Sequence, residues 1–221
     1  MFRLHVVNRK YAQSIITSLR NKDLSQIEFR KGLVRLGRIL GLEIIEDYDY
    51  EEIEVTTPLN VKVRGLRVKD MENTIILTVL RAAWPLTEGL IKVFYAAKQG
   101  VIAARRVEEK GMHDWSFDID VSYVKLPRIT SDNIVIISDV MVATGSTLVR
   151  VLDELLKRGK PKRFYIASVI TTPIALDKLK KASDEYNIDL RVFTIAIDPE
   201  VNKDGYIVPG LGDAGDRAFG S

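Results

Sequence analysis

The hydrophobic positions of this chain follow two patterns, one continuous and one periodic. Continuous apolar runs predict strands buried on both faces of a parallel sheet, at residues 74–80, 134–137, 164–170 and 192–197. Apolar residues at helical spacing predict helices at residues 23–42, 86–97 and 148–158. A charged stretch at residues 44–58 is typical of a further strand. The order of these elements predicts an α/β fold whose parallel sheet is wound with right-handed crossovers.

Polar residues follow several of the predicted strands: Arg81, Asp139, and the pair Thr171 and Thr172. In open α/β sheets, ligands bind beyond the carboxyl ends of the strands, so we expect these side chains to meet at one cleft. Residues 106–121 fit neither pattern and predict an exposed arm or lid beside that cleft.

Residues 139–147, DVMVATGST, connect a buried strand to the helix predicted at residues 148–158. Backbone N–H groups at a helix N-terminus point outward together, and the helix dipole favours an anion there. Small side chains let a phosphate come close to the backbone. Residues 143–147 therefore predict a phosphate-binding loop.

Two common phosphate-binding templates do not fit. A Walker-type loop is excluded because no Lys precedes Ser146 and Thr147. A dinucleotide fingerprint at Gly210, Gly212 and Gly215 is excluded because too few residues follow for the helix that would hold a pyrophosphate. The loop instead resembles the phosphoribosyl diphosphate (PRPP) loop of the type I phosphoribosyltransferases.

Other segments resemble one branch of that family, the uracil phosphoribosyltransferases. Residues 205–221, GYIVPGLGDAGDRAFGS, resemble its C-terminal uracil-binding segment. Residues 79–89, VLRAAWPLTEG, resemble its pyrophosphate loop, and residues 106–109 with 123–127 resemble its flexible arm. The resemblance therefore covers nearly the whole chain.

Some positions depart from the family pattern. Val140 stands where the family usually has Pro, and Trp84 stands where it usually has Gly. Residues 107–121 match the arm poorly. These departures concern the local shape of loops and leave the implied reaction unchanged.

The resemblance implies a phosphoribosyltransferase-type α/β fold, with a parallel-stranded sheet flanked by helices. One domain of residues 1–221 would include a flexible arm at about 105–127 and a C-terminal base-binding hood at about 198–221. The implied activity is that of a glycosyltransferase of pyrimidine salvage, which converts uracil and PRPP to UMP and diphosphate. The implied cofactor is Mg²⁺, bound largely through substrate oxygens and water.

The resemblance also implies roles for individual residues. The catalytic residues are expected to be Asp139, Arg81 and Arg106. The expected PRPP-binding residues are Arg81, Ala82, Arg106, Asp139, Val140, Met141, Val142, Ala143, Thr144, Gly145, Ser146 and Thr147. The expected uracil-binding residues are Tyr206, Ile207, Gly212, Asp213 and Ala214. No side chain is assigned to a metal, and Asp213 is the one candidate.

In this scheme Asp139 holds the ribose hydroxyls, and Arg81 and Arg106 hold the diphosphate. The 5-phosphate lies at residues 143–147. The resemblance further implies a homodimer or homotetramer, with GTP as a candidate activator and CTP or UMP as a candidate inhibitor.

Composition restricts the remaining possibilities. The chain has 33 basic and 30 acidic residues, and this net charge of +3 is too small to indicate general nucleic-acid binding. It has no Cys, which excludes disulfides and thiolate chemistry, and its 2 His leave little for a metal cluster. The start of the chain lacks an apolar segment long enough for export or membrane insertion, which predicts a cytoplasmic protein.

Three conspicuous groups are expected to be structural or solvated. His5 and His113 have no accompanying nucleophile motif. The basic run at residues 157–163 follows a predicted helix, where a solvated surface is expected.

Two alternative functions stay open at this point. The acceptor base of the same fold could be a purine or orotate, although the GYIVPGLGDAGD segment favours uracil. A regulator that retains the loop and binds RNA without catalysis is a different class, and it would need a concentrated basic face.

Overall fold

The computed structural model describes residues 1–107 and 111–220, and its centre is a sheet with strand order β1-β11-β10-β9-β4-β5-β8. These strands are β1 (Phe2–Val6), β4 (Thr74–Leu80), β5 (Lys98–Arg106), β8 (Ile119–Lys125), β9 (Ile134–Val142), β10 (Arg163–Thr171) and β11 (Leu190–Ile197). The remaining strands are β2 (Tyr50–Thr56), β3 (Lys62–Val68), β6 (Met112–His113), β7 (Ser116–Phe117), β12 (Glu200–Val201) and β13 (Ile207–Val208). The helices are α1 (Lys10–Arg20), α2 (Gln26–Glu46), α3 (Trp84–Leu90), α4 (Ser146–Leu156), α5 (Pro173–Glu185) and α6 (Ala214–Phe219).

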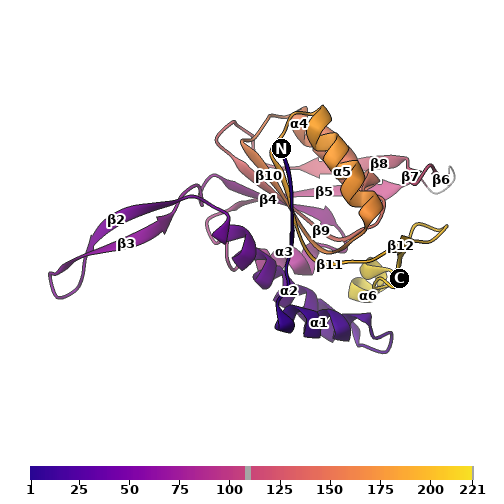
Figure 1. Cartoon of the computed structure of the whole chain (residues 1–221), viewed down its shortest axis with the longest axis horizontal. Coiled ribbons are helices and arrows are strands. Elements are labelled where there is room, and N and C mark those ends of the chain that lie inside the picture. Colours follow the sequence, from indigo (N-terminus) through magenta and orange to yellow (C-terminus); the bar gives the residue numbers. More distant parts are fainter. Residues whose placement is uncertain (108–110, 221) are drawn as a thin grey trace.

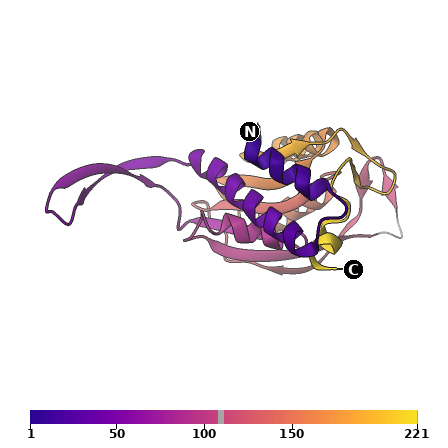
Figure 2. The ribbon, with the colours of Figure 1, turned by 90° about the horizontal axis from the view of Figure 1, so that it is seen from below.

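The predicted α/β class is confirmed. Neighbouring strands of the main sheet pair in parallel, except β5 and β8, which pair antiparallel at one edge. Helices α1, α2 and α3 cover one face, and α4 and α5 cover the other (Figures 1 and 2). Each face has its own buried hydrophobic cluster, because the central strands bury side chains on both sides.

Helices α2 and α3 pack unusually close together at two glycines. A Cβ added at Gly37 would lie 2.0 Å from the carbonyl oxygen of Leu86, and one at Gly89 would lie 2.2 Å from the carbonyl oxygen of Val34. Only glycine fits such a backbone approach. The contact fixes α3, and with it the turn at residues 81–83 that leads out of β4.

Several expected boundaries were wrong. Residues 44–46 continue α2 instead of starting a strand, because Leu36, Leu40 and Ile44 continue its buried face at helical spacing. Helix α3 ends at Leu90, well short of residue 97. Strand β9 runs on to Val142, so Asp139 lies inside the strand and not beyond its end.

Elements β1, α1, β5 and β8 were not predicted. Strands β1 and β8 are the outer strands of the sheet, and most of their residues are exposed or only partly buried. They therefore lack a continuous apolar run. Much of the predicted arm lies in β8 and in the short β6–β7 pair, and its residues 108–110 fall outside the described part of the chain.

A two-stranded hairpin, β2 with β3, projects far from the body of the protein (Figures 1 and 2). Its strands pair antiparallel from Tyr50 with Val68 to Thr56 with Lys62. Large apolar side chains on it face solvent, including Leu59 at 85% exposure and Leu66 at 70%. An isolated hairpin of this kind is only marginally stable in water, and exposed apolar side chains of this size are typical of an interaction surface.

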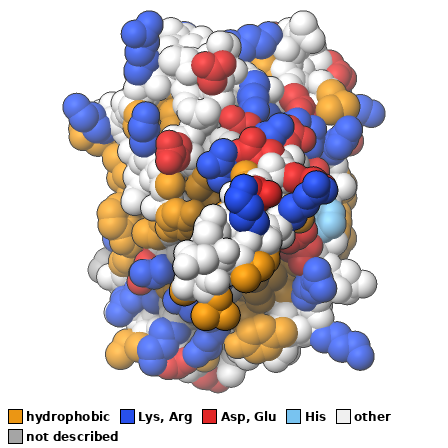
Figure 3. All heavy atoms as spheres, turned by 90° about the vertical axis from the view of Figure 1, so that its left-hand side faces the viewer, with side chains coloured by type: hydrophobic (Ala, Val, Ile, Leu, Met, Phe, Trp, Pro, Cys, Tyr) orange, Lys and Arg blue, Asp and Glu red, His pale blue; other side chains and the backbone are white. Residues whose placement is uncertain are grey.

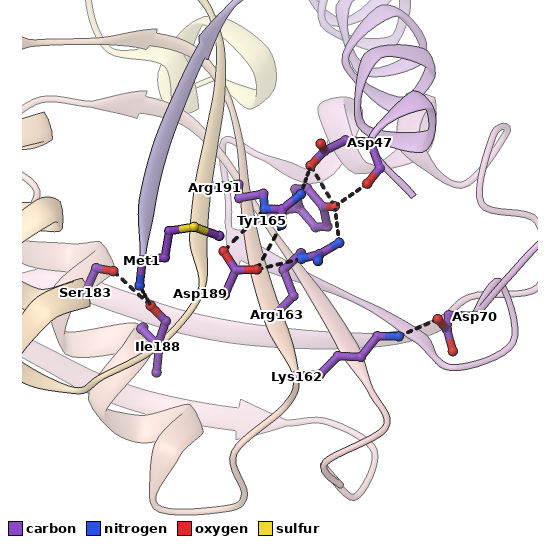
Figure 4. Close-up of polar contacts among 10 residues, drawn as sticks. All are labelled: Met1, Asp47, Asp70, Lys162, Arg163, Tyr165, Ser183, Ile188, Asp189 and Arg191. Atoms are coloured by element: carbon purple, nitrogen blue, oxygen red, sulfur yellow. Dashed lines mark hydrogen bonds and ion pairs between the residues drawn. The ribbon is translucent and has the colours of Figure 1, made fainter. Parts of the chain in front are cut away.

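The amino ends of the central strands carry a closed network of charges (Figure 4). Arg191 bridges Asp47 and Asp189, and Arg163 donates to Asp189 at 2.8 Å. Tyr165 Oη donates to Asp47 Oδ2 at 3.0 Å. Burial alone would raise the pKa of Asp189, but hydrogen bonds from the two arginines hold that pKa below its ordinary value. The expectation of a solvated basic run at residues 157–163 is thus wrong for Arg163.

No helix within residues 1–107 and 111–220 is both long and apolar enough to span a membrane.

Candidate functional site

A cavity of about 530 Å³ lies beyond the carboxyl ends of β4, β5 and β9. Segments that are far apart in the chain line it: Ala82, Arg105, Arg106, Val107, Asp139, Met141, Ala143, Gly205, Tyr206, Ile207, Gly212, Asp213, Ala214 and Gly215. All five predicted uracil-binding residues are among them. The cavity is large enough for a ligand the size of a nucleotide.

Asp139 lies on β9 with its carboxylate turned to this cavity. Burial raises the pKa of Asp139 to about 7. Hydrogen bonds from the backbone N–H groups of Met141 and Val140 and the positive charge of Arg106 lower this pKa, but their effect is smaller than that of burial. A carboxyl group with a pKa this high in a cleft is typical of a functional group. Val140 and Val142 have their side chains in the hydrophobic core, so only their backbone can reach a ligand.

Arg106, the last residue of β5, spans the cleft towards the C-terminal segment. Its Nη2 donates to the carbonyl oxygen of Gly205 at 3.1 Å, and its guanidinium lies 4.6 Å from the ring centre of Phe117. Neighbouring Arg105 also lines the cavity, and its Nε lies 3.1 Å from Asp120 Oδ2 on β8. Among the described residues, Arg106 donates its hydrogen bonds to the backbone carbonyl oxygens of Asp204 and Gly205 and to no carboxylate, so its charge is available to an anion in the cavity.

Arg81 lies at the start of the turn between β4 and α3. The Leu80–Arg81 peptide bond is cis, and Arg81 Nη2 lies 2.8 Å from Asp216 Oδ1 on α6. Both side chains are about half exposed. Arg81 thus lies beside the cavity and is paired to the C-terminal segment, whereas Ala82 lines the cavity itself.

The predicted phosphate loop connects β9 to α4. Gly145, with φ of 77°, precedes the first helical residue, Ser146. A Cβ at Gly145 would lie 3.2 Å from the carbonyl oxygen of Ala175, so the left-handed backbone and the close packing both favour glycine. Thr144 Oγ1 and Ser146 Oγ lie 3.0 Å apart. Ser146 N donates to Thr144 Oγ1 at 3.4 Å, whereas the other first-turn N–H groups of α4 have no carbonyl partner inside the helix and can bind an anion.

Thr171 and Thr172 do not reach the cavity, contrary to expectation. Both are fully buried, and Thr172 Oγ1 donates to the carbonyl oxygen of Ala143 at 2.6 Å while capping α5 through Ala175 N. Thr172 therefore supports the loop from behind.

The C-terminal segment is held over the cleft by contacts that were not foreseen. Arg20 binds the buried carboxylate of Asp198 with two hydrogen bonds of 2.8 and 2.7 Å. The same carboxylate accepts from the backbone N–H of Gly210 at 2.8 Å, and Arg20 also donates to the carbonyl oxygen of Gly210. Bidentate pairs of this kind fix geometry as well as adding stability. No local sequence motif could have predicted these contacts, because Arg20 and Asp198 are 178 residues apart.

Asp213 lines the cavity and caps α6, its Oδ1 accepting from Asp216 N at 2.9 Å. A short helix thus exists at residues 214–219, although it is too short to act as the helix of a dinucleotide fold. Within residues 1–107 and 111–220, no cluster of three or more His, Asp or Glu side chains is placed to hold a metal ion. The two cavity carboxylates, Asp139 and Asp213, suit an ion whose other ligands are substrate oxygens and water.

Comparison with known proteins agrees with this geometry. The family model described as uracil phosphoribosyltransferase matches residues 6–221. A protein named uracil phosphoribosyltransferase from Methanococcus vannielii is 50% identical over 210 residues, covering 95% of this chain and 86% of that protein. A protein of the same name from Thermococcus gammatolerans is 49% identical over 211 residues, covering 96% and 90%. The solved structure titled "Structure of AQ2163 protein from Aquifex aeolicus" has a TM-score of 0.85 and 30% identity, and covers 98% of both chains.

Proposed function

The chain belongs to the uracil phosphoribosyltransferase family, and from this premise we propose that residues 1–221 form one catalytic domain around the described cavity. Enzymes of this family are pentosyl transferases that make UMP and diphosphate from uracil and PRPP. One observation carries the assignment of the site. Asp139 and Ala143 of the β9–α4 segment, Arg106 and the C-terminal segment come from distant parts of the chain and line one cavity. Of the phosphate loop, Ala143 lines this cavity, and Ser146 lines a second cavity that also borders Val107 and Lys178.

The phosphate loop and Asp139 hold the phosphoribosyl group in this proposal. N–H groups and hydroxyls of residues 143–147 bind the 5-phosphate at the N-terminus of α4. Asp139 accepts hydrogen bonds from the ribose hydroxyls, for which it needs its charged form. Met141 and Ala143 line the same cavity as Asp139.

Arg106 binds the diphosphate, and Arg81 joins it by exchanging its contact with Asp216 for diphosphate oxygens. Both contacts strengthen as negative charge builds on the leaving group, which favours the transition state over the ground state. Asp139 and Asp213 are the cavity carboxylates that would supply oxygen ligands to Mg²⁺, and the ion would neutralise part of the diphosphate charge.

Uracil lies against the C-terminal segment, between Tyr206, Ile207 and residues 212–214. The Arg20–Asp198 clamp keeps the backbone of this segment rigid, so its N–H and C=O groups are preorganised for one base. The reaction breaks the C1′–O bond through an oxocarbenium-like state with diphosphate as the leaving group, and uracil N1 forms the new bond to C1′ as its proton passes to a diphosphate oxygen. The protein therefore needs no nucleophile and acts by orientation, charge stabilisation and exclusion of water.

The decisive experiment measures UMP formation from uracil and PRPP with Mg²⁺. Uracil should be converted, whereas orotate and hypoxanthine should react far more slowly. Adding GTP, CTP and UMP in turn tests the implied regulation. Conversion of another base in preference to uracil would overturn the acceptor assignment, and no reaction with any base would overturn the catalytic one.

The β2–β3 hairpin supports the proposal that the enzyme is a homo-oligomer. Its exposed apolar side chains are suited to pack against a second copy of the chain, which would bury them. Figure 3 views the molecule from the hairpin side and shows exposed hydrophobic side chains among mixed positive and negative ones. The mixed charge of this face lacks the single-sign patch that RNA binding requires.

Light scattering tests the assembly. The wild-type protein should form a dimer or tetramer, and a Leu59→Lys, Leu66→Lys double variant should shift towards monomer. Arg64→Lys on β3 is the matched control and should keep the wild-type mass. A monomeric wild type would contradict the proposal.

A further inference from the structure

Lys178 lies against the phosphate loop although it belongs to α5, on a different segment of the chain. Its Nζ donates to Ser146 Oγ at 3.2 Å and to the carbonyl oxygen of Trp115 at 2.9 Å. A Cβ added at Gly145 would lie 3.5 Å from Lys178 Cβ. Helix α5 therefore crosses directly over the loop, and Lys178 reaches the first residue of α4.

Among the residues that the structure describes, the positive charge of Lys178 has no counter-ion. Within the described ranges, no carboxylate lies at ion-pair distance from its Nζ, and both of its acceptors are neutral. Partial burial lowers the pKa of Lys178, with no opposing contribution from an acidic neighbour. Such a partly desolvated cation gains stability when an anion comes next to it.

The phosphate loop, in turn, lacks a positively charged side chain of its own. Residues 143–147 contain no Lys or Arg. A phosphate monoester carries about 1.5 to 2 negative charges at neutral pH, whereas a helix N-terminus offers about half a positive charge. The loop therefore needs a further cation to balance a bound 5-phosphate.

Ser146 brings the cation and the loop together. Its hydroxyl lies at the N-terminus of α4, where a phosphate would bind, and it already accepts from Lys178 Nζ at 3.2 Å. A phosphate oxygen hydrogen-bonded to the same hydroxyl would lie within about 6 Å of the ammonium group, and closer when the flexible side chain turns. At that distance, in a partly water-excluded site, the attraction is substantial.

Building on the proposed function, we propose that Lys178 is an additional PRPP-binding residue that supplies the positive charge of the 5-phosphate subsite. When PRPP binds, the ammonium group exchanges a neutral oxygen for a phosphate oxygen. Lys178 thus has the role that the lysine within a Walker-type loop has, but it comes from a neighbouring helix.

The same contacts connect the subsite to the arm. Ser146 Oγ also accepts from the backbone N–H of Phe117 at 3.2 Å, and it lies 3.2 Å from Ser116 Oγ. Lys178 holds the carbonyl oxygen of Trp115 on the same arm. Binding of the 5-phosphate would therefore rearrange the contacts that hold the arm on the loop in the ligand-free protein.

The test compares inhibitors that occupy opposite ends of the PRPP site. Ribose 5-phosphate probes the phosphate loop, and diphosphate probes Arg106 and Arg81. Lys178→Met should raise KM for PRPP and Ki for ribose 5-phosphate about tenfold or more, because a charged hydrogen bond is lost. Ki for diphosphate and KM for uracil should stay near wild type.

Further variants separate charge from structure. Lys178→Gln keeps a donor for Trp115 without the charge and should behave like Lys178→Met, whereas Lys178→Arg should restore most of the PRPP affinity. Lys181→Met, an exposed lysine on the same helix, is the matched control and should match wild type. Thermal unfolding of each variant shows whether the fold is retained.

The outcomes are distinguishable. A wild type that makes no UMP would reject the proposed function. An active wild type with an unchanged Ki for ribose 5-phosphate in Lys178→Met would reject the role of Lys178. Equal weakening of ribose 5-phosphate and diphosphate would also reject it, because it would indicate a general structural effect.

Discussion

The two ends of the central sheet treat charge in opposite ways. At the amino ends of β10 and β11, Arg163 and Arg191 share Asp189, and Asp47 closes the network (Figure 4). At the carboxyl ends, Asp139, Arg106 and Lys178 hydrogen-bond only to neutral groups among the described residues.

Two carboxylates make the contrast concrete. Arginine partners lower the pKa of Asp189, whereas burial raises the pKa of Asp139 to about 7. The arginines favour the charged form of Asp189, whereas burial disfavours the charged form of Asp139 until a ligand binds to it. Among the described residues, a buried carboxyl that forms no ion pair therefore marks the site, at the opposite end of the sheet from the ion-paired one. This separation of roles makes the comparison testable at both ends.

The largest expected effect sharpens the functional side of the comparison. Backbone groups at the rigid C-terminal segment should match uracil, which has an N3–H donor between two acceptors. Cytosine reverses this pattern at N3 and position 4, so buried polar groups would face like groups. The ratio of kcat/KM for uracil over cytosine should be on the order of 10⁴.

Gly212→Val tests where this selectivity arises. Gly212 lines the cavity with φ of 70°, a backbone conformation that valine disfavours. The variant should lose uracil turnover, and truncation of Ile207 to Ala should cost less. Normal uracil kinetics in Gly212→Val would locate base recognition elsewhere.

The second effect concerns the paired end. Asp189→Asn removes the carboxylate that forms ion pairs with both Arg163 and Arg191. The substitution should lower the free energy of unfolding by about 2 to 4 kcal/mol. Chemical denaturation measures this loss. Activity of the folded variant should stay within about twofold of wild type, because the network lies at the far end of the sheet.

Asp153→Asn is the control for that measurement, because Asp153 forms its ion pairs on the surface of α4. It should cost less than about 1 kcal/mol. An Asp189 variant that lost activity while keeping its stability would contradict the division between the two ends.

The third effect returns to the cleft. Asp139→Asn should lower kcat by roughly tenfold or more without unfolding the protein, since a charged hydrogen bond to a hydroxyl contributes about 1.5 to 3 kcal/mol. Steady-state kinetics and a thermal melt measure the two quantities separately. Wild-type kinetics in this variant would remove Asp139 from the ribose site.

The smallest effect is the dependence of stability on pH. The carboxyl of Asp139 has a pKa of about 7 in the folded protein, compared with an ordinary value of 3.8. Between these two pH values the folded chain therefore keeps this carboxyl protonated, whereas the unfolded chain does not. Its contribution to stability is therefore lost as pH rises through this range.

Asp139→Asn lacks this titration. The stability of wild type relative to the variant should fall by about 1 kcal/mol between about pH 4 and pH 7.5, less than full burial would give because the carboxylate borders the cavity. Denaturation at several pH values measures the difference. A relative stability that rises with pH would show that Asp139 has a charged partner in the folded protein.

The sequence predicted the parts of the fold that are buried on both sides. Strands β4, β9, β10 and β11 have continuous apolar runs, because helices cover each face. Outer strands such as β1 have one exposed side and a mixed sequence, so no run marked them. Helix α1 had a usable signal in Ala12, Ile15, Ile16 and Leu19, whose spacing matches its buried face.

The candidate site was predictable mainly where its residues lie in continuous segments. Asp139 and the phosphate loop lie in one continuous segment, and the C-terminal segment is equally continuous. Lys178 and the Arg20–Asp198 clamp depend on how distant helices cross, which no local pattern encodes. The contact of Arg81 with Asp216 is likewise a product of tertiary packing.

The pairing of β1 with β11 has a consequence for biosynthesis. Met1 N donates to the carbonyl oxygen of Ile188, a contact that spans 187 residues, and β1 then follows β11 in parallel register. At about 5 to 20 residues per second, β1 leaves the ribosome roughly 10 to 40 s before β11 is made. During that interval β1 cannot pair with β11, and the apolar face of α1 stays exposed. The sheet therefore gains this outer strand only after β11 has been made.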